Sequence, residues 1–208
     1  LTGYKGECIQ AFFEDGKKWN WSITYSQGPT EWDTGRRLWE AKALLEENFL
    51  LCYSDNFVPF PIEKLLSIHH KLDPSVTLMV SPKSPGNIKI DDKGLVTHYN
   101  KNRSTKYLHV EIGYMFVDRD KVLSHFSSPD CNFSTILQSL ADKKQLGGLI
   151  QKDCYHSISD PKRWKLMEKY LKQKKIVLLD RDGVINLKAS KGTYITDWEH
   201  FQLIDSNR

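Results

Sequence analysis

Apolar residues recur along this chain at two spacings, and the two spacings predict different elements. Apolar positions three and four apart are typical of helices, whereas alternation or a short continuous apolar run is typical of strands. Helices are predicted at 6–16, 33–49, 61–72, 120–126, 133–145 and 160–174, and strands at 21–26, 49–56, 76–81, within 86–101, at 109–118 and within 146–159. Because helices alternate with strands, the sequence predicts an α/β fold with a mainly parallel sheet.

Particular residues predict where these elements begin and end. Asp33 or Thr34 is placed to cap the helix that follows, because short polar side chains accept hydrogen bonds from the first helical amides. Asp160 is placed as the cap of the last helix, with Pro161 at its first position. The pair Gly147-Gly148 is expected to stop the helix before it, and the segment that follows is expected to hold a last strand pair.

The pattern divides the chain once. The last predicted helix gives way near Gln173 to a new apolar run, "KIVLLD". We therefore expect one domain at 1–171 and the beginning of a second at 174–208.

Composition narrows the function classes. With 30 basic and 26 acidic side chains the net charge is +4, and no basic tract favours nucleic acid as a partner. The four cysteines form no CxxC pair, which argues against a metal cluster or a disulfide framework and favours a cytoplasmic protein. No apolar run reaches the ~20 residues that a membrane span needs.

Two acidic residues follow apolar strands, at the position where open α/β sheets bind ligands. Asp55 follows the nearly continuous apolar run at 49–56, which is typical of a parallel strand buried on both faces. Asp180 follows "KIVLL". Position alone leaves a second interpretation of Asp55 open, as a turn residue that caps the next helix.

Residues 1–171 resemble a sugar-phosphate nucleotidyltransferase. The resemblance depends on the order and spacing of six motifs: "DTGRRL" (33–38), "FLLCYSDN" (49–56), "PGNIKID" (85–91), "YNKNR" (99–103), "VEIGYMF" (110–116) and "HSISDPKRW" (156–164). It implies a Rossmann-like fold of the GT-A type. It also implies that a sugar phosphate and a nucleoside triphosphate are the partners.

The resemblance assigns a role to several residues. Asp55 would hold Mg²⁺, a hard cation that prefers carboxylate oxygen. Lys101 would meet the sugar phosphate as a point charge. Substrate would also be contacted by Thr34 and Gly35 at a helix N-terminus and, in the sugar pocket, by Gly86, Glu111 and Gly113.

The chain departs from the family pattern at three places. The Gly-rich loop that carries the main catalytic Arg and Lys is expected before Leu1. Asn100 stands where the family has Glu. Ser157 stands where many relatives carry a second metal-binding Asp, and a hydroxyl is a weak Mg²⁺ ligand.

Residues 174–208 resemble the start of a haloacid-dehalogenase-type phosphatase. The motif is "IVLLDRDGVIN" (176–186), and "GTYITDWEHFQLI" (192–204) narrows the likeness to the heptose bisphosphate phosphatases. The resemblance implies that Asp180 attacks phosphorus, that Asp182 is the general acid and base, and that both hold Mg²⁺. The remaining groups of that site are expected beyond Arg208, so we expect residues 1–208 to lack phosphatase activity.

The two resemblances together predict part of a bifunctional enzyme of activated-heptose biosynthesis. One module would remove the 7-phosphate of a heptose 1,7-bisphosphate, and the other would couple the heptose 1-phosphate to a nucleotide, by resemblance guanylyl. Two alternatives remain open. The substrate of the transferase is a hexose 1-phosphate, or residues 1–171 form a degenerate module that binds a sugar nucleotide or docks without catalysis.

Overall fold

The computed structural model describes residues 1–59, 61–152 and 155–172, together with 187, 190, 191, 193, 197 and 199–204. The chain divides into two compact units, Leu1–Met167 and Glu168–Arg208. The division falls inside α6 (Pro161–Leu171), ahead of the boundary that the sequence predicts near Gln173. Among the described residues, no helix combines the length and the apolar character that crossing a membrane requires.

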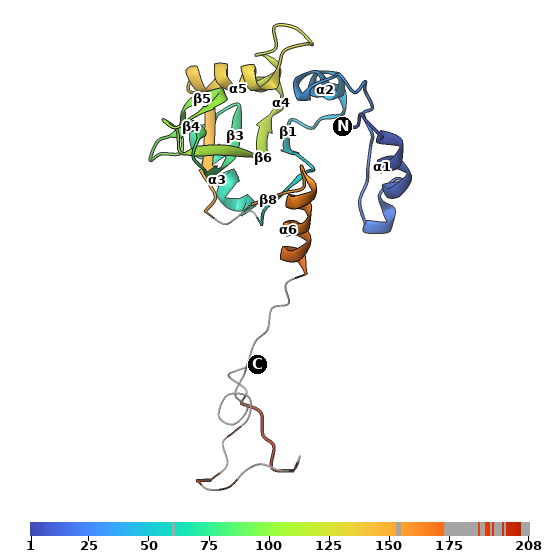
Figure 1. Ribbon diagram of the computed structural model, residues 1–208, viewed down its shortest axis with the longest axis vertical. Helices are drawn as coiled ribbons and strands as arrows, with labels where there is room; N and C mark the ends of the chain where they lie inside the picture. The colour runs from blue at the N-terminus through green and yellow to red at the C-terminus, as the bar shows by residue number, and fades with distance from the viewer. Residues whose placement is uncertain are drawn as a thin grey trace. The chain divides into compact units, whose positions relative to one another are not determined.

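The first unit is built on a six-stranded sheet (Figure 1). Five strands run in the order β5-β4-β6-β3-β7, and β1 pairs with the second half of β6. The strands are β1 (Asn48–Cys52), β3 (Val76–Pro82), β4 (Gly86–Ile90), β5 (Val96–Ser104), β6 (His109–Asp118) and β7 (Leu146–Ile150). A separate two-stranded ladder joins β2 (Asn56–Phe57) to β8 (His156–Ser157).

Strand direction is the point at which the sequence prediction fails. The α/β class is confirmed, but among the ladders between the described strands only β3 and β7 are parallel, and the other ladders are antiparallel. The run that contains β1 was expected to be a parallel strand buried on both faces, and β1 instead lies antiparallel to β6 with two of its five residues exposed. An apolar run indicates that a strand is buried, but not whether its neighbours run parallel or antiparallel to it. The pattern could therefore not distinguish the two arrangements.

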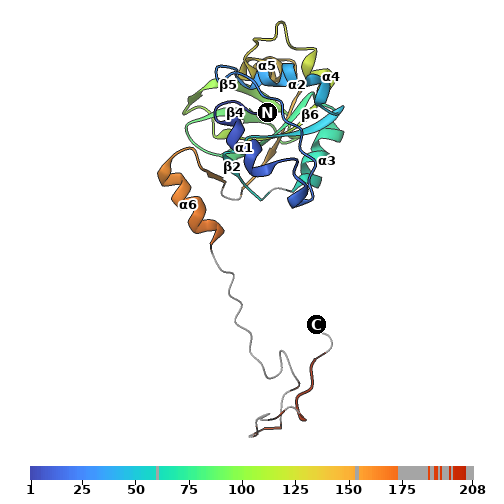
Figure 2. The ribbon, with the colours of Figure 1, turned by 90° about the vertical axis from the view of Figure 1, so that its right-hand side faces the viewer.

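Helices cover both faces of the sheet. Figures 1 and 2 show α2 (Thr34–Ala41), α4 (Arg119–Leu123) and α5 (Phe133–Asp142) on one side, and α3 (Ile62–Leu72) on the other. The alternating side chains of β3 supply both cores. Leu78 and Val80 join the cluster beneath α5, whereas Met79 joins the cluster beneath α3.

Three local predictions are wrong, each for a tertiary reason. Residues 21–26 form no strand, because no strand among the described residues pairs with them, and the neighbouring Gln27 makes just an isolated bridge to Thr2. The helix before Gly147 ends at Asp142, and both glycines lie in β7, where a Cβ on Gly147 would come within 2.9 Å of Thr77 Oγ1. The last two strands do not pair with each other, since β7 joins β3 and β8 joins β2.

The two predicted caps are confirmed. Asp33 Oδ1 accepts a hydrogen bond from Arg36 N at 3.0 Å at the start of α2. Asp160 Oδ1 accepts from Lys162 N and Arg163 N, each at 3.0 Å, at the start of α6. The start of any helix leaves its first amides without carbonyl partners, which is why the sequence signal is dependable here.

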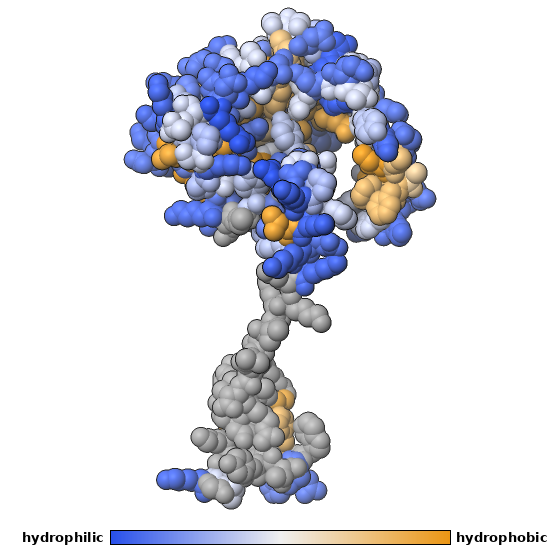
Figure 3. Space-filling model, in the orientation of Figure 1, coloured by the Kyte–Doolittle hydropathy of each residue, from blue (hydrophilic) through white to orange (hydrophobic). Residues whose placement is uncertain are grey.

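Helix α1 (Gly6–Phe13) leaves its apolar side in solvent. Phe12 is 65% exposed, and with Phe13 it packs on Trp19 at ring-centroid distances of 5.4 and 5.0 Å. Trp21, 57% exposed, stacks on Phe13. Figure 3 shows an orange, hydrophobic area over α1. The helical pattern of this segment therefore predicts its secondary structure correctly, although the apolar side is not part of the core.

Candidate functional site

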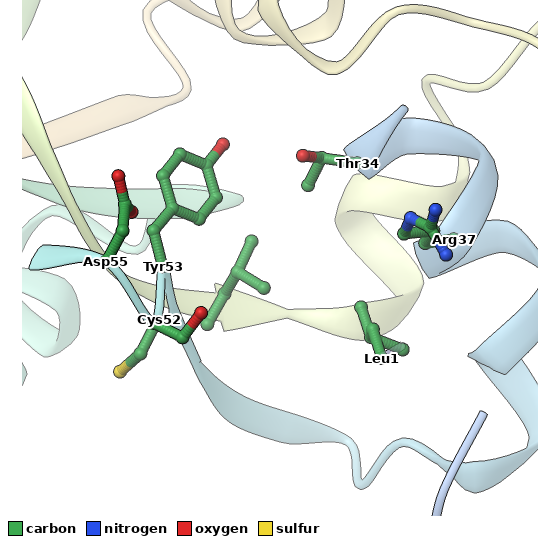
Figure 4. Close-up of a pocket in the computed structure, with 8 residues that line it drawn as sticks. Leu1, Thr34, Arg37, Cys52, Tyr53 and Asp55 are labelled. Carbon is green, nitrogen blue, oxygen red and sulfur yellow. The ribbon is translucent and has the colours of Figure 1, made fainter. Parts of the chain in front are cut away.

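A cavity of about 260 Å³ opens at the carboxyl end of β1 (Figure 4). Its walls come from the first turn of α2 and from the turn that follows β1. The lining residues are Leu1, Thr34, Arg37, Leu51, Cys52, Tyr53, Ser54 and Asp55. Thr34 and Asp55, both predicted from the sequence, are therefore brought to one cavity although they lie on different elements.

Asp55 is held by its backbone. The turn after β1 closes with a hydrogen bond from Asn56 N to Tyr53 O at 3.2 Å. Asp55 O accepts from Ile158 N at 2.8 Å, next to the pairing of Asn56 with Ser157. The Asp55 side chain is consequently left on the cavity wall, beside Tyr53 (Figure 4). Asp55 does not cap α3, whose N-cap is Pro61 without a side-chain hydrogen bond, so the capping alternative is wrong.

The Tyr53 phenol points across the cavity toward the Thr34 hydroxyl (Figure 4). Burial raises the pKa of Tyr53, and the nearby charges of Glu111, Asp33 and Asp55 raise it further. The phenol therefore stays neutral and keeps its O–H as a donor. Sequence reasoning did not single out Tyr53. The available signal was its place two residues before Asp55, at the end of an apolar strand.

Arg37 lines the cavity, but its guanidinium is already occupied. It donates to Thr2 O at 2.6 Å, to Pro29 O at 2.7 Å and to Trp32 O at 3.1 Å. These three carbonyls belong to the segment before α2, so Arg37 fastens that segment to the helix. These bonds use three of the five N–H donors of the guanidinium and fix its position.

Gly113 lies in a bulge of β6 that makes room for Tyr53. Its φ is +75°, and a Cβ there would come within 2.7 Å of Tyr53 Cδ2. The register between β3 and β6 shifts at this point, and Tyr53 N donates to Gly113 O at 2.8 Å. The bulge that glycine permits is thus part of the wall behind the cavity.

Glu111 is a buried carboxyl on the same strand. Burial raises the pKa of Glu111 to about 7, from an ordinary value of 4.5. Its Oε2 is buried and finds no hydrogen-bond partner among the described residues. Its charge acts on the phenols of Tyr53 and Tyr99, so the three side chains are neighbours. A buried polar atom without a partner is costly, and such atoms in native proteins call for a ligand, a water or a strain explanation.

The remaining predicted substrate contacts lie elsewhere on the sheet. Gly86 faces protein backbone, since a Cβ there would be 2.5 Å from His109 O. Gly35 likewise packs on Cys131 O, which would be 2.1 Å from a Cβ. Packing therefore explains both glycines, and contact with substrate stays a prediction. Lys101 is exposed on β5 and makes no hydrogen bond or ion pair with the described residues. It is not among the residues that line the cavity.

The donors available for Mg²⁺ are few. No group of three or more His, Cys, Asp or Glu side chains is arranged to hold a metal in the part of the chain that the structure describes. Ser157 lies beside Asn56 in the β2–β8 ladder, so its backbone is next to that of Asp55. A single carboxylate, that of Asp55, suits an ion that takes most of its ligands from substrate phosphates and water, as Mg²⁺ commonly does.

The predicted phosphatase residues cannot be placed. Asp180 and Asp182 lie outside the described residues.

Comparison with known proteins bears on the fold. No protein-family model matches the chain, and no curated protein sequence matches it. A solved structure described as a glucose-1-phosphate thymidylyltransferase from Bacillus anthracis, in complex with sucrose, matches with a TM-score of 0.69 at 12% identity over 84% of this chain and 74% of that chain. HddC from Yersinia pseudotuberculosis, also solved with GMP-PN, matches with a TM-score of 0.62 at 16% identity over 81% of this chain and 76% of that chain. The chain therefore has the fold of these proteins, which confirms the predicted fold class.

Proposed function

We propose that the protein transfers a nucleotidyl group from a nucleoside triphosphate to a sugar 1-phosphate. The observation that supports this most is the cavity at the end of β1, where Asp55, Tyr53 and Thr34 meet in a chain of this fold. Structures of the same fold are in complex with sucrose and with GMP-PN, which agrees with a sugar and a nucleotide as the two ligands.

The chemistry requires little from protein acids and bases. The attacking group is already a phosphate oxygen, so positioning and charge neutralisation supply most of the catalysis. Asp55 would hold Mg²⁺, which when bound offsets the charge of the phosphates. Thr34 and Gly35 would meet the nucleotide at the start of α2, with the Tyr53 phenol directed toward Thr34 across the cavity (Figure 4).

The sugar would lie along β6. The unpartnered Oε2 of Glu111 offers a hydrogen bond to a sugar hydroxyl, and the bulge at Gly113 accommodates the Tyr53 ring. Lys101, exposed and without a partner among the described residues, would meet the sugar phosphate. Gly86 would contribute backbone only.

The finer parts of the proposal depend on the sequence. We propose a guanylyl group as the one transferred and a heptose 1-phosphate as the acceptor. A phosphatase that uses Asp180 and Asp182 with Mg²⁺ would prepare this acceptor from the 1,7-bisphosphate. We place the reactions in the cytoplasm, because the thiols of Cys8, Cys52 and Cys131 are free, as a reducing compartment requires.

A substrate screen on the full-length protein tests the proposal. Heptose and hexose 1-phosphates are each combined with the four nucleoside triphosphates and Mg²⁺, and pyrophosphate release is measured. Release only with heptose 1-phosphate and GTP is the expected result. A preference for a hexose 1-phosphate would favour the first alternative. Binding of a sugar nucleotide by calorimetry, without pyrophosphate release in any combination, would favour the non-catalytic module and overturn the proposal.

A further inference from the structure

The first residues of two helices are joined by one side-chain hydrogen bond. Asn132 is the N-cap of α5, and its Oδ1 accepts from Ser134 N at 3.0 Å. Its Nδ2 donates to Asp33 Oδ2 at 2.9 Å. Asp33 is itself the N-cap of α2, through its other oxygen. Each side chain thus caps its own helix with one atom and reaches the other cap with the second.

The start of α2 continues into the candidate site. Thr34, the residue after Asp33, lines the cavity, and the Tyr53 phenol points toward it (Figure 4). Gly35, the next residue, lies against the Cys131 carbonyl just before α5. The bond between the caps therefore ties the start of α5 to the residue next to Thr34.

Other contacts at the same junction differ in kind. Gly35 packs against Cys131 O without polar contact. Arg36 Nη1 meets Asp130 Oδ1 at 2.8 Å, but the Asp130 side chain is 78% exposed. Asn132 is exposed as well, but its bond to Asp33 joins the first residues of both helices, whereas the ion pair joins α2 to the turn before α5.

We propose that Asn132 is a positioning residue for nucleotidyl transfer, which acts by tying the start of α5 to Asp33 and so holding Thr34 at the cavity. This inference rests on the proposed function, because its effect is on the site of that reaction. It assigns no chemical step to Asn132. The amide is specifically required, since one atom must accept from a helical amide while the other donates to a carboxylate.

If Asn132 acts only as an N-cap, the activities of its variants should rank differently from those expected if it also bridges to Asp33. As N-caps, Asn, Asp and Ser are nearly equivalent. As a bridge, Ser lacks the donor, and Asp faces the Asp33 carboxylate with a like charge. We expect kcat/KM for transfer to fall about tenfold in Asn132→Ser and further in Asn132→Asp, while melting temperatures stay similar.

A reciprocal exchange provides the rescue. In Asp33→Asn with Asn132→Asp, the amide and the carboxylate change places, and each can still cap its own helix. The double variant should recover most of the lost kcat/KM. Asp130→Asn, which removes only the exposed ion pair, is the control and should match the wild type. Activity of Asn132→Asp at or above that of Asn132→Ser, or no recovery in the exchanged pair, would overturn the inference.

Hydrogen exchange separates this inference from the proposed function. The amides of α2 near Arg36 should exchange faster in Asn132→Ser, faster still in Asn132→Asp, and at the wild-type rate in the exchanged pair. If the wild type transfers no nucleotidyl group, the proposed function fails, yet this order would still support the tie between the helices. Unchanged exchange in all variants would refute the tie whatever the activity.

Discussion

Asp55 ends on the cavity wall because the turn after β1 is fixed through its backbone, which leaves the carboxylate available. We expect Asp55→Asn to lower nucleotidyl transfer by about several hundred-fold, on the order of 4 kcal/mol of barrier, because the amide is a poor ligand for Mg²⁺. The measurement is kcat in the full-length protein, with circular dichroism to check the fold. Asp92→Asn, at an exposed turn, is the control. Rates within a few-fold of the wild type would show that Asp55 does not hold a catalytic Mg²⁺.

Lys101 tests the sugar-phosphate side of the same site. Its ammonium group is exposed and has no partner among the described residues, so its removal should leave the fold unchanged. We expect Lys101→Ala to raise KM for the sugar 1-phosphate by about tenfold, with KM for the nucleotide unchanged, since one charge pair to a phosphate is lost. Lys93→Ala, also exposed, is the control. Unaltered sugar kinetics would make Lys101 a solvated surface residue.

Glu111 should make stability depend on pH. Burial raises its pKa from 4.5 to about 7, so the folded state keeps a proton that the unfolded state loses between these values. The free energy of unfolding should therefore fall as pH rises from 4.5 to 7, by on the order of 3 kcal/mol, and level off above. In Glu111→Gln an amide that does not titrate replaces the carboxyl, so this contribution to the pH dependence of stability is absent.

Urea unfolding of both proteins at pH 4.5 and pH 8 checks this expectation. The stability of Glu111→Gln relative to the wild type should increase between the two pH values. Glu63→Gln, at an exposed position of α3, should show no comparable change. A difference that is the same at both pH values would mean that the Glu111 carboxyl ionises at its ordinary pH.

At the scale of elements, the bulge in β6 is the feature that shapes the site. Gly113 and Gly94 both have positive φ, +75° and +88°, so alanine is strained at either position. At Gly113 the new Cβ would also meet Tyr53 Cδ2 at 2.7 Å, whereas at Gly94 the nearest atom is 3.3 Å away. We expect Gly94→Ala to cost about 1 kcal/mol of stability and Gly113→Ala about 3 kcal/mol.

Transfer activity distinguishes the two glycine variants further. Gly113→Ala should also displace Tyr53 and lower kcat/KM, and Gly94→Ala should not. Thermal melts and kinetics on the same preparations give both quantities. Equal losses at the two positions would mean that backbone strain alone matters and that Tyr53 needs no space from the bulge.

At the scale of the whole molecule, two activities are proposed for two parts of the sequence. In the full-length protein, Asp55→Asn should abolish nucleotidyl transfer and leave bisphosphate hydrolysis unchanged. Asp180→Asn should do the reverse, because the nucleophile of an aspartyl-phosphate mechanism has no substitute. Phosphate release and pyrophosphate release, each from its own substrate, provide the measurement. Loss of both activities in either variant would contradict two separate sites.

The sequence by itself determined what depends on local chemistry. The helix caps Asp33 and Asp160, the limits of β6 and the position of Asp55 after a strand all follow from hydrogen-bonding needs and apolar periodicity within a few residues. These signals are local because the first amides of a helix and the alternating faces of a strand are satisfied by near neighbours.

Only the tertiary structure decided which strands pair and which side chains meet. Strand direction depends on partners far along the chain, so an apolar run predicted β1 but not its antiparallel pairing with β6. The grouping of Tyr53, Thr34 and Glu111, and the bond from Asn132 to Asp33, join residues that no local pattern connects. Burial also gives Glu111 its raised pKa, and burial is a property of the packed molecule and not of its sequence neighbours.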